Sequence, residues 1–162
     1  MELASPQGNL VSLSICGYEF PGTTGSGERD WDANWLIIEG AVKSGDQEWT
    51  FRHPCLTTWE ARELSDWLRA IADGSRQPAP VDPENGSGGL LSFTEPNIAF
   101  AYQGNTSEAA TLRVYLSLEA LPASMTGTDN FEYFVELVLT REDLAIAADT
   151  WDDELRAFPV RA

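Results

Sequence analysis

Apolar residues change their spacing at residues 54–60, from every second position to every third or fourth. Before this point, apolar and polar side chains alternate in residues 10–15, which is typical of a half-buried strand. After it, Thr57 and Glu60 have the spacing of a helix capping box, and Gly74 can take the left-handed conformation that ends a helix. The chain therefore combines strands with an amphipathic helix. The residues expected to face inward on this helix are Trp59, Leu64, Trp67, Leu68 and Ile71.

The remaining segments follow the same two patterns. Residues 43–46 contain a glycine and predict a hairpin turn, whereas residues 75–89 are rich in proline and glycine and predict a surface loop. Thr140 and Asp143 predict the start of a second helix that ends near Phe158. Its expected apolar stripe is Leu144, Ala147, Ala148, Trp151 and Leu155. The expected strands are residues 10–15, 30–42, 48–53, 90–93, 98–102, 112–119 and 131–139.

The order of these segments is strands, helix, strands, helix, with mostly hairpin-length connections. This order predicts an α+β fold with one mostly antiparallel sheet and two amphipathic helices packed against it. A chain of 162 residues has enough apolar surface for one sizeable core but not for two. We therefore expect a single domain over residues 1–162.

The chain is strongly acidic. It contains 10 Lys and Arg against 26 Asp and Glu, a formal net charge of −16. This charge repels phosphate backbones and anionic lipids, so binding to nucleic acid or to a membrane surface is disfavoured. A basic protein is the expected partner. The absence of a basic N-terminal region and of any long apolar run indicates a soluble, cytoplasmic protein.

The sequence offers few groups for catalysis. His53 is the only histidine, and it shares a strand face with Trp49 and Phe51, which favours a packing role. No glycine-rich phosphate-binding motif occurs, and Cys16 and Cys55 lack the spacing of a redox or zinc site. We expect both cysteines to be buried free thiols. The sequence therefore predicts a protein that is not an enzyme, with no catalytic residue and no cofactor.

Residues 30–34, Asp-Trp-Asp-Ala-Asn, match the start of a calcium-binding loop. The match fails further on, because the loop needs glycine where Trp35 stands and glutamate where Ala41 stands. We therefore expect no metal site. In the alternative interpretation this segment is the rim of a strand. It would expose Asp30, Asp32 and Asn34 and turn Trp31, Ala33 and Trp35 inward.

Acidic residues gather in two places that are candidates for partner binding. Asp149, Asp152 and Asp153 share one face of the last helix by their spacing, and Arg156 is the nearest cation in the sequence. The second candidate is the strand rim. Its carboxylates are Asp30, Asp32 and Glu39.

Three segments carry a resemblance to a known family. Residues 30–40, residues 54–60 and the Phe-Thr-Glu-Pro-Asn run at 93–97 resemble the WapI-type immunity proteins, and the likeness extends from Tyr18 to Phe158-Pro159. The resemblance implies a small cytoplasmic antidote to a contact-delivered bacterial toxin whose C-terminal part is commonly a nuclease. It implies no catalytic residue.

The residues themselves leave two other functions open. One is a small enzyme that acts on a cationic small molecule, which requires a pocket with a few carboxylates of perturbed pKa. The other is an adaptor domain with no toxin partner, whose charge serves only solubility.

Overall fold

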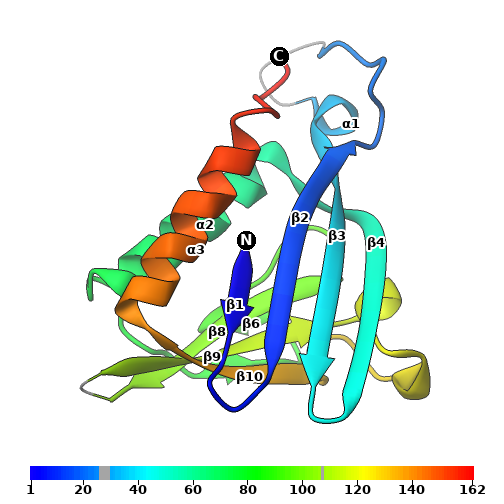
Figure 1. The fold of residues 1–162 in the computed structure, drawn as a ribbon. Coiled ribbons are helices and arrows are strands. Elements are labelled where there is room, and N and C mark those ends of the chain that lie inside the picture. Colours follow the sequence, from blue (N-terminus) through cyan, green and yellow to red (C-terminus); the bar gives the residue numbers. More distant parts are fainter. Residues whose placement is uncertain (26–29, 107) are drawn as a thin grey trace.

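The computed structural model describes residues 1–25, 30–106 and 108–162 (Figure 1). The long strands of a first sheet stand beside a pair of helices, and a second sheet closes one end of the space between them. The helical segments are α1 (Trp31–Asn34), α2 (Thr58–Ala72), α3 (Arg141–Leu155) and the 3₁₀ turns η1 (Leu118–Ala120) and η2 (Ala123–Met125). None of the helices in the described ranges is long and apolar enough to cross a membrane.

The first sheet is antiparallel, with the strand order β1-β2-β3-β4. Burial alternates along β3, because one face of the sheet packs on the interior and the other is open to solvent. Gly40 of β3 lies opposite Phe51 of β4, and a Cβ atom at Gly40 would stand 2.2 Å from the Phe51 ring. A glycine is therefore required beneath this ring. The strands are β1 (Glu2–Ala4), β2 (Leu10–Tyr18), β3 (Trp35–Ser44) and β4 (Gln47–Thr57).

The second sheet is also antiparallel, with the order β10-β9-β8-β7. It meets the first sheet where Val138 donates its amide to the Ser5 hydroxyl at 3.2 Å and the Asn9 side chain donates to the Glu136 carbonyl at 3.1 Å. These contacts cover part of the outer edge of β10. The strands are β7 (Leu90–Leu91), β8 (Ile98–Asn105), β9 (Ala109–Leu116) and β10 (Phe134–Thr140), and a separate hairpin contains β5 (Val81–Asp82) and β6 (Ser87–Gly88).

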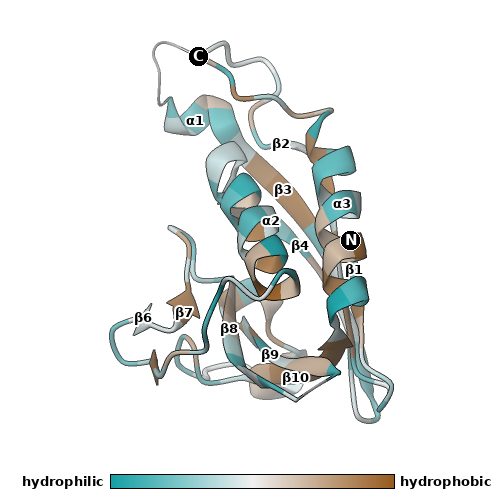
Figure 2. Ribbon diagram, turned by 90° about the vertical axis from the view of Figure 1, so that its left-hand side faces the viewer, coloured by the Kyte–Doolittle hydropathy of each residue, from teal (hydrophilic) through white to brown (hydrophobic). Residues whose placement is uncertain are grey.

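Helices α2 and α3 lie side by side (Figure 2). Both begin with the capping boxes that the sequence predicts, and Gly74 follows α2 with φ +82°. Glu60 does more than cap its helix. Its carboxylate accepts hydrogen bonds from the Thr57 amide and from the Thr94 amide, both at 2.8 Å. The start of α2 is thereby fixed to the segment that leads into β8.

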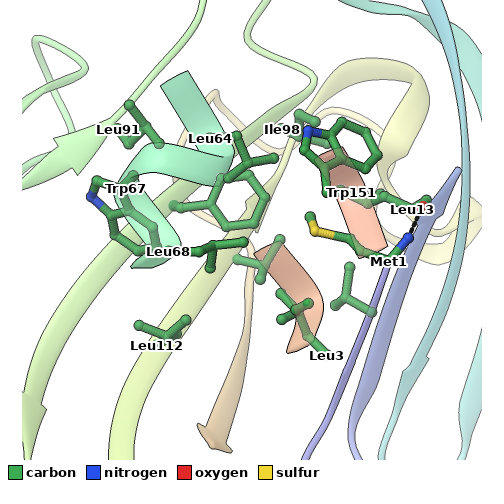
Figure 3. Packing of buried hydrophobic residues seen from close by; sticks show 14 of the residues in the cluster. Met1, Leu3, Leu13, Leu64, Trp67, Leu68, Leu91, Ile98, Leu112 and Trp151 are labelled. Carbon is green, nitrogen blue, oxygen red and sulfur yellow. Dashed lines mark hydrogen bonds between the residues drawn. The ribbon is translucent and has the colours of Figure 1, made fainter. Parts of the chain in front are cut away.

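The apolar interior joins both sheets to both long helices (Figure 3). Trp151 of α3 belongs to the same cluster as Leu13 of β2 and Ile98 of β8, and its side chain is fully buried. Its indole nitrogen donates to the Ala61 carbonyl of α2 at 2.8 Å. The two apolar stripes predicted from helical spacing are buried, except that Trp59 is only half-buried.

The α+β class is confirmed, but the expected single sheet with two helices is wrong. Within the described ranges the strands form three separate sheets, and three α-helices are present. The chain leaves the first sheet through α2 and the 75–89 segment, which itself contains β5 and β6, and enters a new sheet at β7. Leu118 and Phe131 have φ values of 52° and 63°, and this left-handed backbone shortens the strands expected at 112–119 and 131–139.

Candidate functional site

The carboxylates predicted on α3 are held by an arginine from α2. Arg69 donates to Asp149 at 2.6 Å and also to Asp152, and the Ser65 hydroxyl donates to Asp152 at 2.6 Å. Burial acts to raise the pKa of Asp152, but the hydrogen bonds from Ser65 and Arg69 outweigh it and hold this pKa below its ordinary value. These acids therefore join the two helices.

The third acid of this cluster, Asp153, pairs with Arg156 at 2.7 Å, and both side chains are exposed. Arg156 is the nearest cation in the sequence, but Arg69, 80 residues away from Asp149, also pairs with two acids of this cluster. Helical spacing cannot show a cation that another helix supplies. The charge of Asp149, Asp152 and Asp153 is thus partly compensated within the molecule.

The segment expected to be a strand rim begins with one turn of helix, α1. The Asp30 carboxylate accepts a hydrogen bond from the Ala33 amide at 3.1 Å and caps this turn. Asp32 is exposed as expected, but Ala33 and Asn34 are both buried, so the prediction of an exposed Asn34 is wrong. Trp31, expected to face inward, is 42% exposed. A helical turn replaces the alternating faces of a strand, which explains both errors.

Asn34 connects three distant parts of the chain. Its amide nitrogen donates to the Asp30 carbonyl at 2.8 Å and to the Arg161 carbonyl at 2.7 Å. Its oxygen accepts from the Thr58 hydroxyl and from the Arg161 amide, both at 2.9 Å. All four hydrogen-bonding positions of this buried amide are used, so α1 is locked to the start of α2 and to the C-terminal segment.

Three tryptophans gather where α1 meets α2, and we call Trp31, Trp35 and Trp59 the tryptophan surface. The ring centroids of Trp31 and Trp59 are 5.0 Å apart in an edge-to-face arrangement, and those of Trp31 and Trp35 are 6.2 Å apart. Trp35 and Trp59 are half-buried. The sequence pattern predicts all three rings in the core, so this surface is not visible from the sequence alone.

Exposed carboxylates lie close to the tryptophan surface. Asp32 follows Trp31 on α1, and Glu63 and Asp66 continue the face of α2 on which Trp59 stands, by their spacing of four and seven residues. We call Asp32, Glu63 and Asp66 the acidic stripe. Among the residues that the structure describes, no Lys or Arg lies within ion-pair distance of these three carboxylates.

Glu39, the last member of the predicted rim, lies apart from the others. It is exposed on the solvent face of β3, where its cross-strand neighbours are Ser14 and Arg52. Trp35 is on the same face four residues earlier, which corresponds to about 13 Å along a strand. The structure thus brings Asp30 and Asp32 together on α1 and leaves Glu39 on the open sheet.

His53 and Cys55 are neighbours but do not form a nucleophile–base pair. The Cys55 thiol donates to the His53 carbonyl at 3.2 Å, whereas the His53 ring lies 3.9 Å from the Glu119 carboxylate. Burial, followed by the charges of Glu119 and Glu95, raises the pKa of Cys55 to about 12. The thiol is therefore protonated near neutral pH, and a protonated thiol is a weak nucleophile.

The two thiols are expected to differ sharply in reactivity. Both are free, and Cys55 is buried as expected, but Cys16 is exposed beside a bulge in β2, contrary to the sequence-based expectation. At pH 8 we expect a thiol reagent to modify Cys16 in the folded protein and Cys55 only after denaturation. Mass spectrometry of the native protein should show one modification, and the Cys16→Ser variant should show none. Rapid modification of Cys55 under native conditions would contradict its burial.

The described ranges show no metal-ligand cluster, and an acidic hollow on their surface is open to solvent. They contain no group of three His, Cys, Asp or Glu side chains placed to hold a metal ion. One surface hollow is lined by Glu84, Asp129 and Glu132, but all three side chains are exposed. The hollow therefore lacks the water-excluding walls that strengthen electrostatic interactions in catalytic sites.

One protein-family model matches nearly the whole chain. The model of the immunity protein WapI-like family matches residues 2–159, a range that includes both large sheets, all three α-helices and the tryptophan surface. No curated protein and no solved structure matches the chain. The family match agrees with the resemblance seen in residues 30–40, 54–60 and 93–97. The chain therefore belongs to the WapI-like immunity protein family.

Proposed function

We propose that this protein neutralises a cognate toxin domain by binding it directly in the cytoplasm, without catalysis. The observation that carries the proposal is the family match over residues 2–159, because an immunity protein acts by binding its toxin. We further propose that the bound domain is the basic, C-terminal nuclease domain of a contact-delivered toxin. The net charge of −16 supports this partner, since nucleases hold phosphates in positive clefts and opposite charges accelerate association.

The acidic stripe is the favoured contact surface for such a partner. Asp32, Glu63 and Asp66 have no internal cation among the described residues, so binding breaks no existing ion pair. Asp30 adds a further negative charge at the start of α1. The α3 carboxylates Asp149, Asp152 and Asp153, together with Glu39, contribute to the long-range field that steers the partner. The α3 acids would have to give up Arg69 and Arg156 before they could contact it closely.

Charge reversal of the acidic stripe should slow binding. We expect the triple variant Asp32→Lys, Glu63→Lys, Asp66→Lys to associate about tenfold or more slowly at low salt, with a shallower salt dependence, because it removes the steering charge nearest the interface. The partner is the purified, catalytically inactive C-terminal domain of the toxin encoded next to this protein. Association rates measured between about 50 and 500 mM salt span weak to strong screening.

The matched control is Asp46→Lys, Glu108→Lys, Asp129→Lys, which changes the net charge equally at exposed carboxylates away from α1 and α2. Equal slowing in both variants would mean that net charge alone matters and that the acidic stripe is not the contact surface. Reversal of the three α3 acids is a poorer test, since it also breaks the Arg69 link to α2. If the wild-type protein forms no complex at any salt concentration, with both partners folded, the proposed function is wrong.

A further inference from the structure

The tryptophan surface is unusual because it leaves a large ring in water. Trp31 is 42% exposed, although a tryptophan exposed to this extent forgoes much of the stabilisation that burial would provide. Tryptophan is enriched at the centres of protein interfaces, where a few aromatic side chains supply most of the binding energy. An exposed aromatic cluster in a single chain therefore points to a partner.

The position of Trp31 is fixed before any partner arrives. The Asp30 cap and the four hydrogen bonds of Asn34 hold α1 against α2 and the C-terminal segment. The edge of one ring also packs on the face of another, with 5.0 Å between the centroids of Trp31 and Trp59. A pre-organised side chain loses little conformational entropy on binding, so its contacts contribute more fully to affinity.

The chemistry around Trp31 selects a cationic partner group. The face of an indole ring attracts Arg and Lys side chains. Elsewhere in the described chain Arg76, Arg113 and Arg161 each lie over an aromatic ring, but no such contact is found at Trp31, Trp35 or Trp59. The acidic stripe beside these rings is also without an ion pair in the described ranges. Two independent features, the ring faces and the carboxylates, thus favour a positive charge at the same place.

We infer that the tryptophan surface is the anchor of the toxin interface, and that Trp31 receives an arginine or lysine side chain of the basic toxin domain on its indole face. This inference rests on the proposed function and adds the residue that anchors the complex and the chemistry it recognises. A second copy of this chain is a poorer occupant, because two molecules that each carry a charge of −16 repel one another. The acidic stripe accelerates association with the toxin domain, and the Trp31 ring slows its dissociation.

The test compares Trp31→Ala, Trp31→Leu and wild type in equilibrium binding to the inactive toxin domain described above. We expect Trp31→Ala to raise the Kd about thirtyfold, mainly through faster dissociation, as for a binding hot spot. Trp31→Leu restores apolar area but not the electron-rich face, so it should recover only a small part of the affinity. The matched control is Ile146→Ala on α3, which truncates a side chain that is 56% exposed and should leave the Kd unchanged.

Five outcomes decide the inference. A large loss in Trp31→Ala that Trp31→Leu does not repair, with the thermal transition retained, supports it. Full affinity in Trp31→Leu would mean that Trp31 makes a purely apolar contact and binds no cation. Full affinity in both Trp31→Ala and Trp59→Ala would show that the tryptophan surface does not anchor the complex, although a complex still forms. A wild-type dimer in sedimentation that Trp31→Ala dissociates would assign the surface to a second copy. Absence of any wild-type complex would overturn the proposed function and the inference together.

Discussion

Replacement of Trp151 by alanine is expected to lower the free energy of unfolding by about 3 to 5 kcal/mol. The side chain is fully buried between both sheets and both long helices, and its removal leaves a cavity that rigid neighbours cannot fill. The change also leaves the Ala61 carbonyl without the indole hydrogen bond of 2.8 Å. Urea unfolding should show a lower midpoint with an unchanged slope.

Ile146→Ala is the control on the same helix, because its side chain points to solvent. We expect its free energy of unfolding to differ from that of wild type by no more than about 0.5 kcal/mol. Trp59→Ala should fall between these two variants, since Trp59 is only half-buried. A midpoint for Trp151→Ala within error of wild type would show that α3 does not pack as described.

The Asn34→Ala variant is expected to lose about 2 to 4 kcal/mol, although it removes only a small polar side chain. It leaves hydrogen-bonding partners unpaired on three segments: the half-buried Asp30 carbonyl, the buried Thr58 hydroxyl, and the carbonyl and amide of the half-buried Arg161. Because the amide also holds α1 in place, the same variant should weaken toxin binding at temperatures where the protein is still folded. Denaturant unfolding and equilibrium binding measure the two effects separately.

Asn34→Asp separates the parts of this network, because aspartate keeps the acceptor oxygen but cannot donate when ionised. It should therefore also destabilise the protein. Asn85→Ala provides the control, since Asn85 lies in an exposed turn and hydrogen-bonds only locally to Asp82. Equal stabilities for Asn34→Ala and Asn85→Ala would contradict the role of Asn34 as a link between distant segments.

Local patterns predicted the parts of the fold that depend on neighbouring residues. The capping residues of α2 and α3, and the end of α2 at Gly74, follow from side chains three or four positions apart. The apolar stripes of both helices could also be predicted, because residues three or four positions apart lie on the same face of a helix in any surroundings.

The segment 30–34 shows where this reasoning stops. Over five residues, an alternating polar pattern fits a strand as well as one capped helical turn, so periodicity cannot separate them. The helical turn is favoured by the hydrogen bonds of Asn34 to Thr58 and Arg161, two residues that are remote in sequence. The division of the strands into separate sheets has a similar cause, because it depends on where α2 and the 75–89 segment carry the chain.

The sequence by itself determined the acidity, the α+β class, both long helices and the family to which the chain belongs. Only the tertiary structure decided which charges and rings are available to a partner. Arg69 reaches the α3 carboxylates from another helix, whereas the acidic stripe has no such cation in the described ranges. Trp31 is exposed on the same helical turn on which Asn34 is buried and hydrogen-bonded to Thr58. Local patterns follow from backbone geometry within a few residues, but exposure and pairing depend on segments that meet only when the chain has folded.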